Sequence, residues 1–172
     1  MFRRLVACSL LFLAASISVR GTLAAEPSSR TLLYVAAPGI RDYLEFGGAG
    51  LLVFDVDDNF KFVRRIATPA SRREKPENIK GICAHAGTQS LYFTTLTRLY
   101  RVDLVSDETL YEQELPGGCD RLNMTPNGRW LYVPSLEREH WQVVEAASGK
   151  VVAKLVTNSQ AHNTICSLDG HW

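Results

Sequence analysis

The chain has 172 residues, a formal net charge of +1 and a hydrophobic content of 46%. This balance is that of an ordinary globular protein. It gives no sign of a strongly basic nucleic-acid surface or of attraction to acidic membranes.

The first 25 residues have the features of a secretory signal peptide. Arg3 and Arg4 give a positive start, an apolar stretch follows, and small residues at 22–25 precede Glu26. The apolar stretch is too short for a membrane-spanning helix. The stretch Leu5–Cys8 resembles a lipoprotein cleavage box, but most of the apolar core follows Cys8, which argues against lipidation. We therefore expect a secreted or periplasmic mature domain, residues 26–172, that is not inserted into a membrane.

Three similar units follow one another, at about 31–67, 79–115 and 119–157. In the first unit, Leu32–Val35 and Leu52–Asp55 predict two strands separated by a long glycine-rich loop, residues 38–50. A second long loop, residues 68–78, is polar and basic and leads into the next unit. Loops of this length on a rigid scaffold are functional or mobile, and a solvated connector is the simpler interpretation of the charged one.

The second unit repeats the same strands with Leu91–Phe93 and Leu99–Asp103. Tyr92 and Tyr132 are 40 positions apart. A self-similar unit of this length, built from short alternating strands, is typical of a blade of a β-propeller.

The third unit is the clearest. An inner strand is expected at Asp120–Met124, followed by a hairpin turn at Thr125–Gly128, because Asn-Gly favours tight turns. Further strands are expected at Trp130–Pro134, Trp141–Glu145 and Lys150–Val156. Large aromatic residues recur at the repeat positions, which favours packing between blades over ligand stacking.

Residues 161–172 restart the repeat, because Leu168–Trp172 matches Pro126–Trp130 at a distance of 42 positions. We therefore expect an all-β propeller of four-stranded antiparallel blades, with about three blades and the start of a fourth present. The chain would then be the N-terminal part of a longer protein of seven or eight blades.

Two stretches of the third unit resemble the YVTN-type (WD40-like) β-propeller repeat family. They are Pro126–Val133 (PNGRWLYV) and Ser148–Val152 (SGKVV). The second unit matches through Leu91-Tyr92 and Val102–Leu104 only. The resemblance implies the propeller fold and an exported protein of bacterial type. It does not imply one activity, since the family and its lactonase-like and amine-dehydrogenase-like relatives include binding proteins and enzymes.

Alignment of the repeats places polar residues at the start of each innermost strand. They are Lys80 in the second unit, Asp120 and Arg121 in the third, and His162 and Asn163 in the last. These starts converge on one mouth of a propeller channel, where different polar groups favour a small-molecule or metal site. The alternative is a wet channel mouth with solvated side chains.

Three cysteines, Cys83, Cys119 and Cys166, lie on or beside inner strands. An odd number leaves at least one free thiol or a partner elsewhere, and packing in a crowded strand is the simpler interpretation. Cys83 and Cys166 are two units apart, which argues against a bridge. A zinc site through His162 and Cys166 is not expected, because four residues of a strand span more than about 12 Å.

The sequence therefore predicts a protein that binds a small molecule or a protein partner at the channel face, without cofactor or chemistry of its own. The alternative is an enzyme, either a lactonase-like hydrolase or a periplasmic quinone-dependent dehydrogenase. A hydrolase would need metal ligands at the channel. Asp120, His162 and Asn163 offer three, but Lys80 weakens a divalent-metal site.

Overall fold

A computed structural model describes residues 29–37, 50–69 and 77–171 of the chain. The expected signal peptide and most of both long loops lie outside these ranges. Among the described residues, no helix is long and apolar enough to cross a bilayer.

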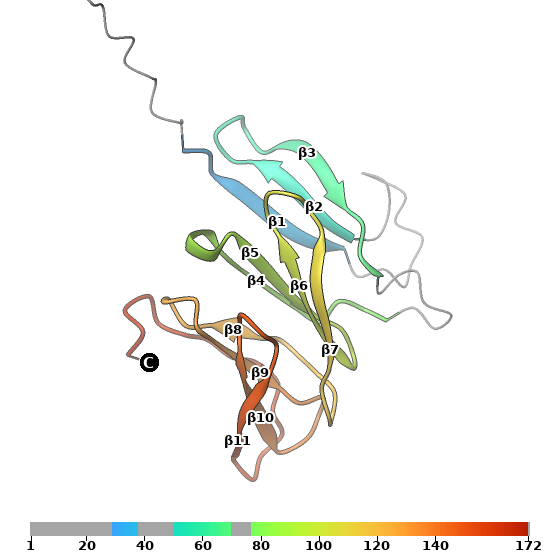
Figure 1. The fold of residues 1–172 in the computed structure, drawn as a ribbon, viewed down its shortest axis with the longest axis vertical. Helices are drawn as coiled ribbons and strands as arrows, with labels where there is room; N and C mark the ends of the chain where they lie inside the picture. Colours follow the sequence, from blue (N-terminus) through green and yellow to red (C-terminus); the bar gives the residue numbers. More distant parts are fainter. Residues whose placement is uncertain (1–28, 38–49, 70–76, 172) are drawn as a thin grey trace, which may run out of the picture.

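The described chain forms three antiparallel sheets that follow one another as blades (Figure 1). Blade 1 contains β1 (Leu32–Ala37), β2 (Gly50–Asp55) and β3 (Lys61–Ile66). Blade 2 contains β4 (Gly81–His85), β5 (Ser90–Thr94), β6 (Arg98–Asp103) and β7 (Thr109–Glu114). Blade 3 contains β8 (Asn123–Met124), β9 (Trp130–Pro134), β10 (His140–Glu145) and β11 (Val151–Val156). The four-stranded antiparallel blades expected from the sequence are thus confirmed for blades 2 and 3.

The strand registers confirm the repeat alignment. Tyr34 pairs with Val53 in blade 1, and Tyr92 pairs with Arg101 in blade 2. Tyr132 pairs with Val143 in blade 3. The three tyrosines therefore occupy one equivalent position, and the residues around each of them can be compared from blade to blade.

A β-bulge recurs at the same position in all three blades. The register between the third and the outermost strand shifts at Val53/Phe54, Arg101/Val102 and Val143/Val144. In each blade the extra residue lies on the outermost strand. Because a bulge strengthens local twist, it turns the outer strand relative to the strands inside it.

Two apolar clusters join the blades. Between blades 1 and 2, the cluster contains seven buried residues: Leu51, Val53, Ile66, Leu91, Phe93, Tyr100 and Val102. Between blades 2 and 3, Tyr92 and Leu99 pack with residues of β8, β9 and β10. Burial between successive blades is the main source of stability in such an array, since a single sheet cannot cover both its faces.

The innermost strand of blade 3 is shorter than the sequence predicts. The expected strand covers Asp120–Met124, but only Asn123 and Met124 pair with β9 along the ladder. Asp120 still donates its N–H to the Pro134 carbonyl (2.9 Å), while Arg121 bridges to Asn163 of the following segment. At Arg121, the backbone therefore leaves the ladder with β9 and pairs with the neighbouring inner segment instead.

Candidate functional site

The starts of three inner segments are structurally equivalent. Lys80 donates its N–H to the Thr94 carbonyl (2.8 Å), and Asp120 donates to the carbonyl of Pro134 (2.9 Å), the residue that corresponds to Thr94. His162 follows Ala161, which is buried like Cys119, the residue before Asp120. Lys80, Asp120 and His162 therefore occupy one repeat position in successive blades, as the alignment predicts.

Backbone contacts hold these starts against one another. The Thr94 hydroxyl donates to the Asp120 carbonyl across the junction of blades 2 and 3 (2.8 Å). The backbone of Gly81 abuts Arg121, which bridges in parallel to Asn163. In the described chain, the starts of these neighbouring inner segments therefore lie side by side.

Three side chains form a continuous hydrogen-bonded series. His162 Nδ1 lies 2.8 Å from Asp120 Oδ2, and Arg121 Nη1 contacts His162 Nε2. A guanidinium has only donors, so Nε2 must accept and Nδ1–H must donate to the carboxylate. This arrangement fixes His162 as the neutral Nδ1–H tautomer.

Asp120 is the buried member of this series. Its side chain is 2% exposed, against 65% for His162 and 50% for Arg121. Within the described chain, Asp120 Oδ1 has no hydrogen-bond partner, and Arg121 Nη1 lies 4.0 Å from it. Asp120 is thus an anchor from which an imidazole and a guanidinium extend toward solvent.

The other two expected site residues belong to the site through their backbones. Lys80 is half-buried, and its N–H donates to the Thr94 carbonyl. Asn163 is exposed, and its side-chain oxygen accepts from the Thr164 N–H (2.9 Å). The structure therefore joins Asp120, Arg121 and His162 by side chains and leaves Lys80 and Asn163 at the edge of that group.

Thr94, whose hydroxyl links β5 to Asp120, is not predicted from the sequence. Its equivalent in blade 3 is Pro134, which has no hydroxyl, so comparison of the repeats carries no signal for this contact. The residue precedes Thr95 at a strand end, where threonine is common for local reasons.

The three described cysteines are free thiols. Burial, with a smaller effect from Cys166, raises the pKa of Cys83 to about 12. Burial also raises the pKa of Cys119 to about 12, with smaller effects from Glu77 and Asp120. Both remain protonated near neutral pH, so Cys119, although adjacent to Asp120, packs as an apolar residue and supplies no thiolate nucleophile.

In the part of the chain that the structure describes, His, Cys, Asp and Glu side chains form no group of three that could hold a metal ion. Asp120 and His162 form only a pair, and Arg121 occupies the imidazole nitrogen that a metal would use. The chemistry available here is hydrogen-bond donation by the remaining N–H groups of the Arg121 guanidinium, whose planar fork suits an anion.

No protein-family model and no curated protein matches this chain. Among solved structures, it is similar to hydrazine synthase from Kuenenia stuttgartiensis, with a TM-score of 0.60 and 15% identity over 73% of the chain. It is also similar to apo AztD from Citrobacter koseri, with a TM-score of 0.52 and 16% identity over 66% of the chain. Both are propeller-type structures, so the β-propeller fold is confirmed. The chain spans 35% and 30% of the lengths of these two structures. At identities this low, the similarity shows a shared fold and no shared function.

Proposed function

We propose that this is an exported propeller protein that binds a small anionic ligand at the inner-strand starts and carries out no chemistry itself. The observation that carries the proposal is the Asp120–His162–Arg121 series, in which a buried carboxylate orients two exposed nitrogen-bearing groups. The contact with His162 holds the Arg121 guanidinium in place, and its remaining N–H donors can bind a small polar ligand with little loss of side-chain freedom.

An anion fits this site better than a cation does. The contact with His162 uses one of the five N–H donors of the Arg121 guanidinium, and the planar fork suits a carboxylate or phosphate. Lys80, at the equivalent position one blade away, adds a second positive charge at the same edge. The single carboxylate of the group, Asp120, is buried, so an incoming anion meets the cationic side chains first.

A second candidate function rests on the same pair of residues. An imidazole whose Nδ1–H is held by a carboxylate is arranged as a general base, which would suit a hydrolase. Its Nε2 must then be released by Arg121 when substrate binds. Binding without turnover is favoured because the described residues near Nε2 provide a guanidinium at that atom and no nucleophile.

Titration with inorganic phosphate, followed by NMR at constant ionic strength, tests the binding proposal. We expect saturable shifts of the Arg121 and His162 signals, and binding about tenfold weaker in Arg121→Gln, which corresponds to about 1.4 kcal/mol. Arg129→Gln is the matched control, since Arg129 lies over the Trp130 ring (4.6 Å) on the hairpin turn. Shifts that do not saturate, or an equal loss in both variants, would overturn the proposal.

Export is the second part of the proposal, and it rests on the leader features of residues 1–25. Fractionation of cells that express the full chain, with N-terminal sequencing of the product, tests it. We expect a product that begins at Glu26 outside the cytoplasm. A cytoplasmic product that keeps its first residues would refute export and leave the ligand proposal standing.

A further inference from the structure

The outer part of blade 3 carries a cavity of about 380 Å³ that is separate from the Asp120–His162 site. It lies by β10 and β11, whereas Asp120 begins the innermost segment of the same blade. The residues that line it are Arg138, Glu139, His140, Lys154 and Val156. The lining therefore contains two permanent cations, one carboxylate and one titratable imidazole.

The strand register places this cavity on the side of blade 3 that packs against blade 2. Gln142 pairs with Val133 on β9 and with Lys154 on β11, and paired residues share one face of a sheet. The buried Gln142 amide donates to the Pro116 carbonyl (3.3 Å) in residues 115–118, here called the link from blade 2. Both sides of this junction lie in the described part of the chain.

A glycine of the link holds the His140 imidazole and the Arg138 side chain close together. Gly117 has a φ of +90°, and a methyl group there would lie 2.9 Å from His140 Cε1 and 3.2 Å from Arg138 Cδ. The Gly117 carbonyl accepts from the Leu136 N–H (3.1 Å), which fixes the β9–β10 loop against the link. Proline has no N–H, so in the hydrogen bond between His140 and the Pro116 backbone the imidazole donates to the carbonyl. Both side chains therefore rest on a backbone surface that a larger residue would fill.

Arg138 lies in a loop that is longer in blade 3 than in blade 2. The loop closed by the Ser135–His140 backbone hydrogen bond (3.0 Å) contains residues 136–139, and its equivalent in blade 2 contains only residues 96 and 97. The Arg138 carbonyl also accepts from a backbone N–H of the segment after β11 (2.7 Å). A longer loop that the backbone holds in place on a rigid scaffold is a common position for a binding residue.

The same strand positions in blade 2 form a closed set of ion pairs. Arg98 contacts Glu112 (2.9 Å) and Glu114 (3.0 Å) across β6 and β7. In the strand registers these three residues correspond, in order, to His140, Lys154 and Val156. Blade 3 therefore carries an ammonium and a valine where blade 2 carries two carboxylates, and the lining of its cavity has an excess of positive charge.

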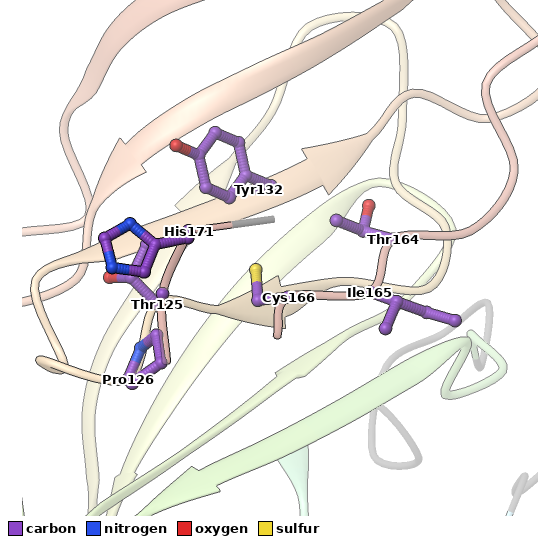
Figure 2. Close-up of a pocket in the computed structure, with 8 residues that line it drawn as sticks. Thr125, Pro126, Tyr132, Thr164, Ile165, Cys166 and His171 are labelled. Carbon is purple, nitrogen blue, oxygen red and sulfur yellow. The ribbon is translucent and has the colours of Figure 1, made fainter. Parts of the chain in front are cut away.

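A cavity of about 300 Å³ on the opposite face of blade 3 has a different chemistry. Thr125, Tyr132, Cys166 and His171 are among the side chains that surround it (Figure 2). The described residues that line it include neither lysine nor arginine. Of these two cavities, only the one beside Lys154 offers the charge that an anion needs.

We propose that the cavity lined by Arg138, His140 and Lys154, here called the rim site, binds a small dianion whose charge lies on oxygen atoms. The planar fork of Arg138 suits two such oxygens, and the Lys154 ammonium adds a point charge. Protonated His140 has N–H groups on both ring nitrogens, so one remains for the ligand beside the Pro116 contact. Val156, which is 60% exposed, offers an apolar wall to the carbon part of an organic ligand.

The rim site couples ligand binding to the protonation of His140. The charged groups that line the cavity with it are Lys154 on β11 and Arg138 and Glu139 in the loop, and the link has no charged side chain. Burial, and then the positive charge of Lys154, lowers the pKa of His140, and the charge of Arg138 adds a smaller lowering. A bound dianion offsets these positive charges, so its binding and the protonation of His140 favour each other.

NMR of the His140 imidazole during titration with sulfate tests the rim site, because sulfate keeps both charges from pH 5 to pH 8. At constant ionic strength set with chloride, we expect saturable shifts and a higher pKa of His140. Binding should be about tenfold weaker in Lys154→Gln and in Arg138→Gln. Lys150→Gln is the matched control, since it removes the same charge immediately before β11 and should bind as the native protein does.

Succinate in a parallel titration at pH 7.5 distinguishes a dicarboxylate from a tetrahedral oxyanion as the preferred ligand. Saturable binding of either anion supports the rim site. Shifts that saturate with neither anion, or an equal loss of affinity in Lys150→Gln and Lys154→Gln, would overturn it.

A charge reversal supplies a second test. Lys154→Glu places a carboxylate where Glu112 lies in blade 2, so it should abolish sulfate binding and raise the pKa of His140 in the absence of sulfate. Circular dichroism verifies that the variant folds. Arg121→Gln should leave the His140 response unchanged, which separates this site from the Asp120–His162 site. Sulfate binding to Lys154→Glu as tight as to the native protein would refute the proposal.

Discussion

The backbone of Gly81 lies against that of Arg121 so closely that a methyl group on Gly81 would be 2.8 Å from the Arg121 Cα. The atoms involved are main-chain atoms of two different blades, and neither can rotate away. Gly81 is therefore required by the approach of blade 2 to blade 3, at the residue that carries the guanidinium of the candidate site.

Gly81→Ala should destabilise the protein by about 1–3 kcal/mol, the usual cost of overpacking a close contact. Urea unfolding measures it. Gly87→Ala is the control, because a methyl group there meets mainly the His85 ring, at 3.0 Å, and a side chain can shift. Equal stability of Gly81→Ala and the native protein would show that the two backbones are farther apart than described.

The hydrogen bonds of His162 predict its tautomer. Nitrogen-15 NMR near neutral pH should find the proton on Nδ1, because Asp120 accepts from that nitrogen and Arg121 donates to the other. In Asp120→Asn the preference should weaken, since a neutral amide is a poorer acceptor than a carboxylate. A proton on Nε2 in the native protein would contradict the series of contacts.

Leu131→Ala should lower the free energy of unfolding by about 2–5 kcal/mol, because Leu131 is 0% exposed in the cluster between blades 2 and 3. The same change at Leu110, which is 48% exposed on β7, should alter stability by about 0.5 kcal/mol or less. Thermal or urea unfolding of the two variants makes the comparison. Similar losses would show that the cluster does not hold the blades together.

His140 should make stability depend on pH. Burial, and then the nearby positive charge of Lys154, lowers the pKa of His140. A hydrogen bond with Pro116 opposes this effect, and the charge of Arg138 adds a smaller lowering. The unfolded chain, in which the imidazole has its ordinary pKa of about 6.5, then binds more protons, so stability is complete above that value and falls as the pH decreases through it.

Urea unfolding between pH 8 and pH 5 measures this dependence, with His140→Gln for comparison. The variant should lose less stability over the interval than the native protein, because the other histidines are common to both. The same slope in both proteins would show that His140 does not carry the effect. Lowered pKa values at Asp55 and Asp103 act at lower pH and do not enter this window.

The fold could be predicted from the sequence because similar residues recur at equivalent positions of the blades, where each has the same structural role. Tyr92 and Tyr132 take equivalent places in the registers, and the turn after Thr125 forms where Asn-Gly predicts it. The inner strand of blade 3 was predicted too long. Alternation of residue types says nothing about Arg121 turning to Asn163, since that depends on the neighbouring segment.

The position of the candidate site could be predicted from the sequence, but the hydrogen bonds among its side chains could not. Repeat alignment brings Asp120 and His162 to one place, but the order in which side chains bond depends on their reach and rotamers. The lone buried oxygen of Asp120 and the hydroxyl contact of Thr94 follow from the three-dimensional junction of two blades. Neither has a counterpart in the other repeats that a sequence comparison could find.

The recurrent bulge sets a limit on redesign of these blades. Leu110 and Val152 are the extra residues of two outer strands, so deletion of either would restore a regular ladder. The shortened strand would keep its cross-strand pairs but lose the additional local twist that the bulge provides. A consensus module built from this chain must therefore keep an outer strand one residue longer than its partner, and shuffled blades should exchange at the loops before β4 and β8.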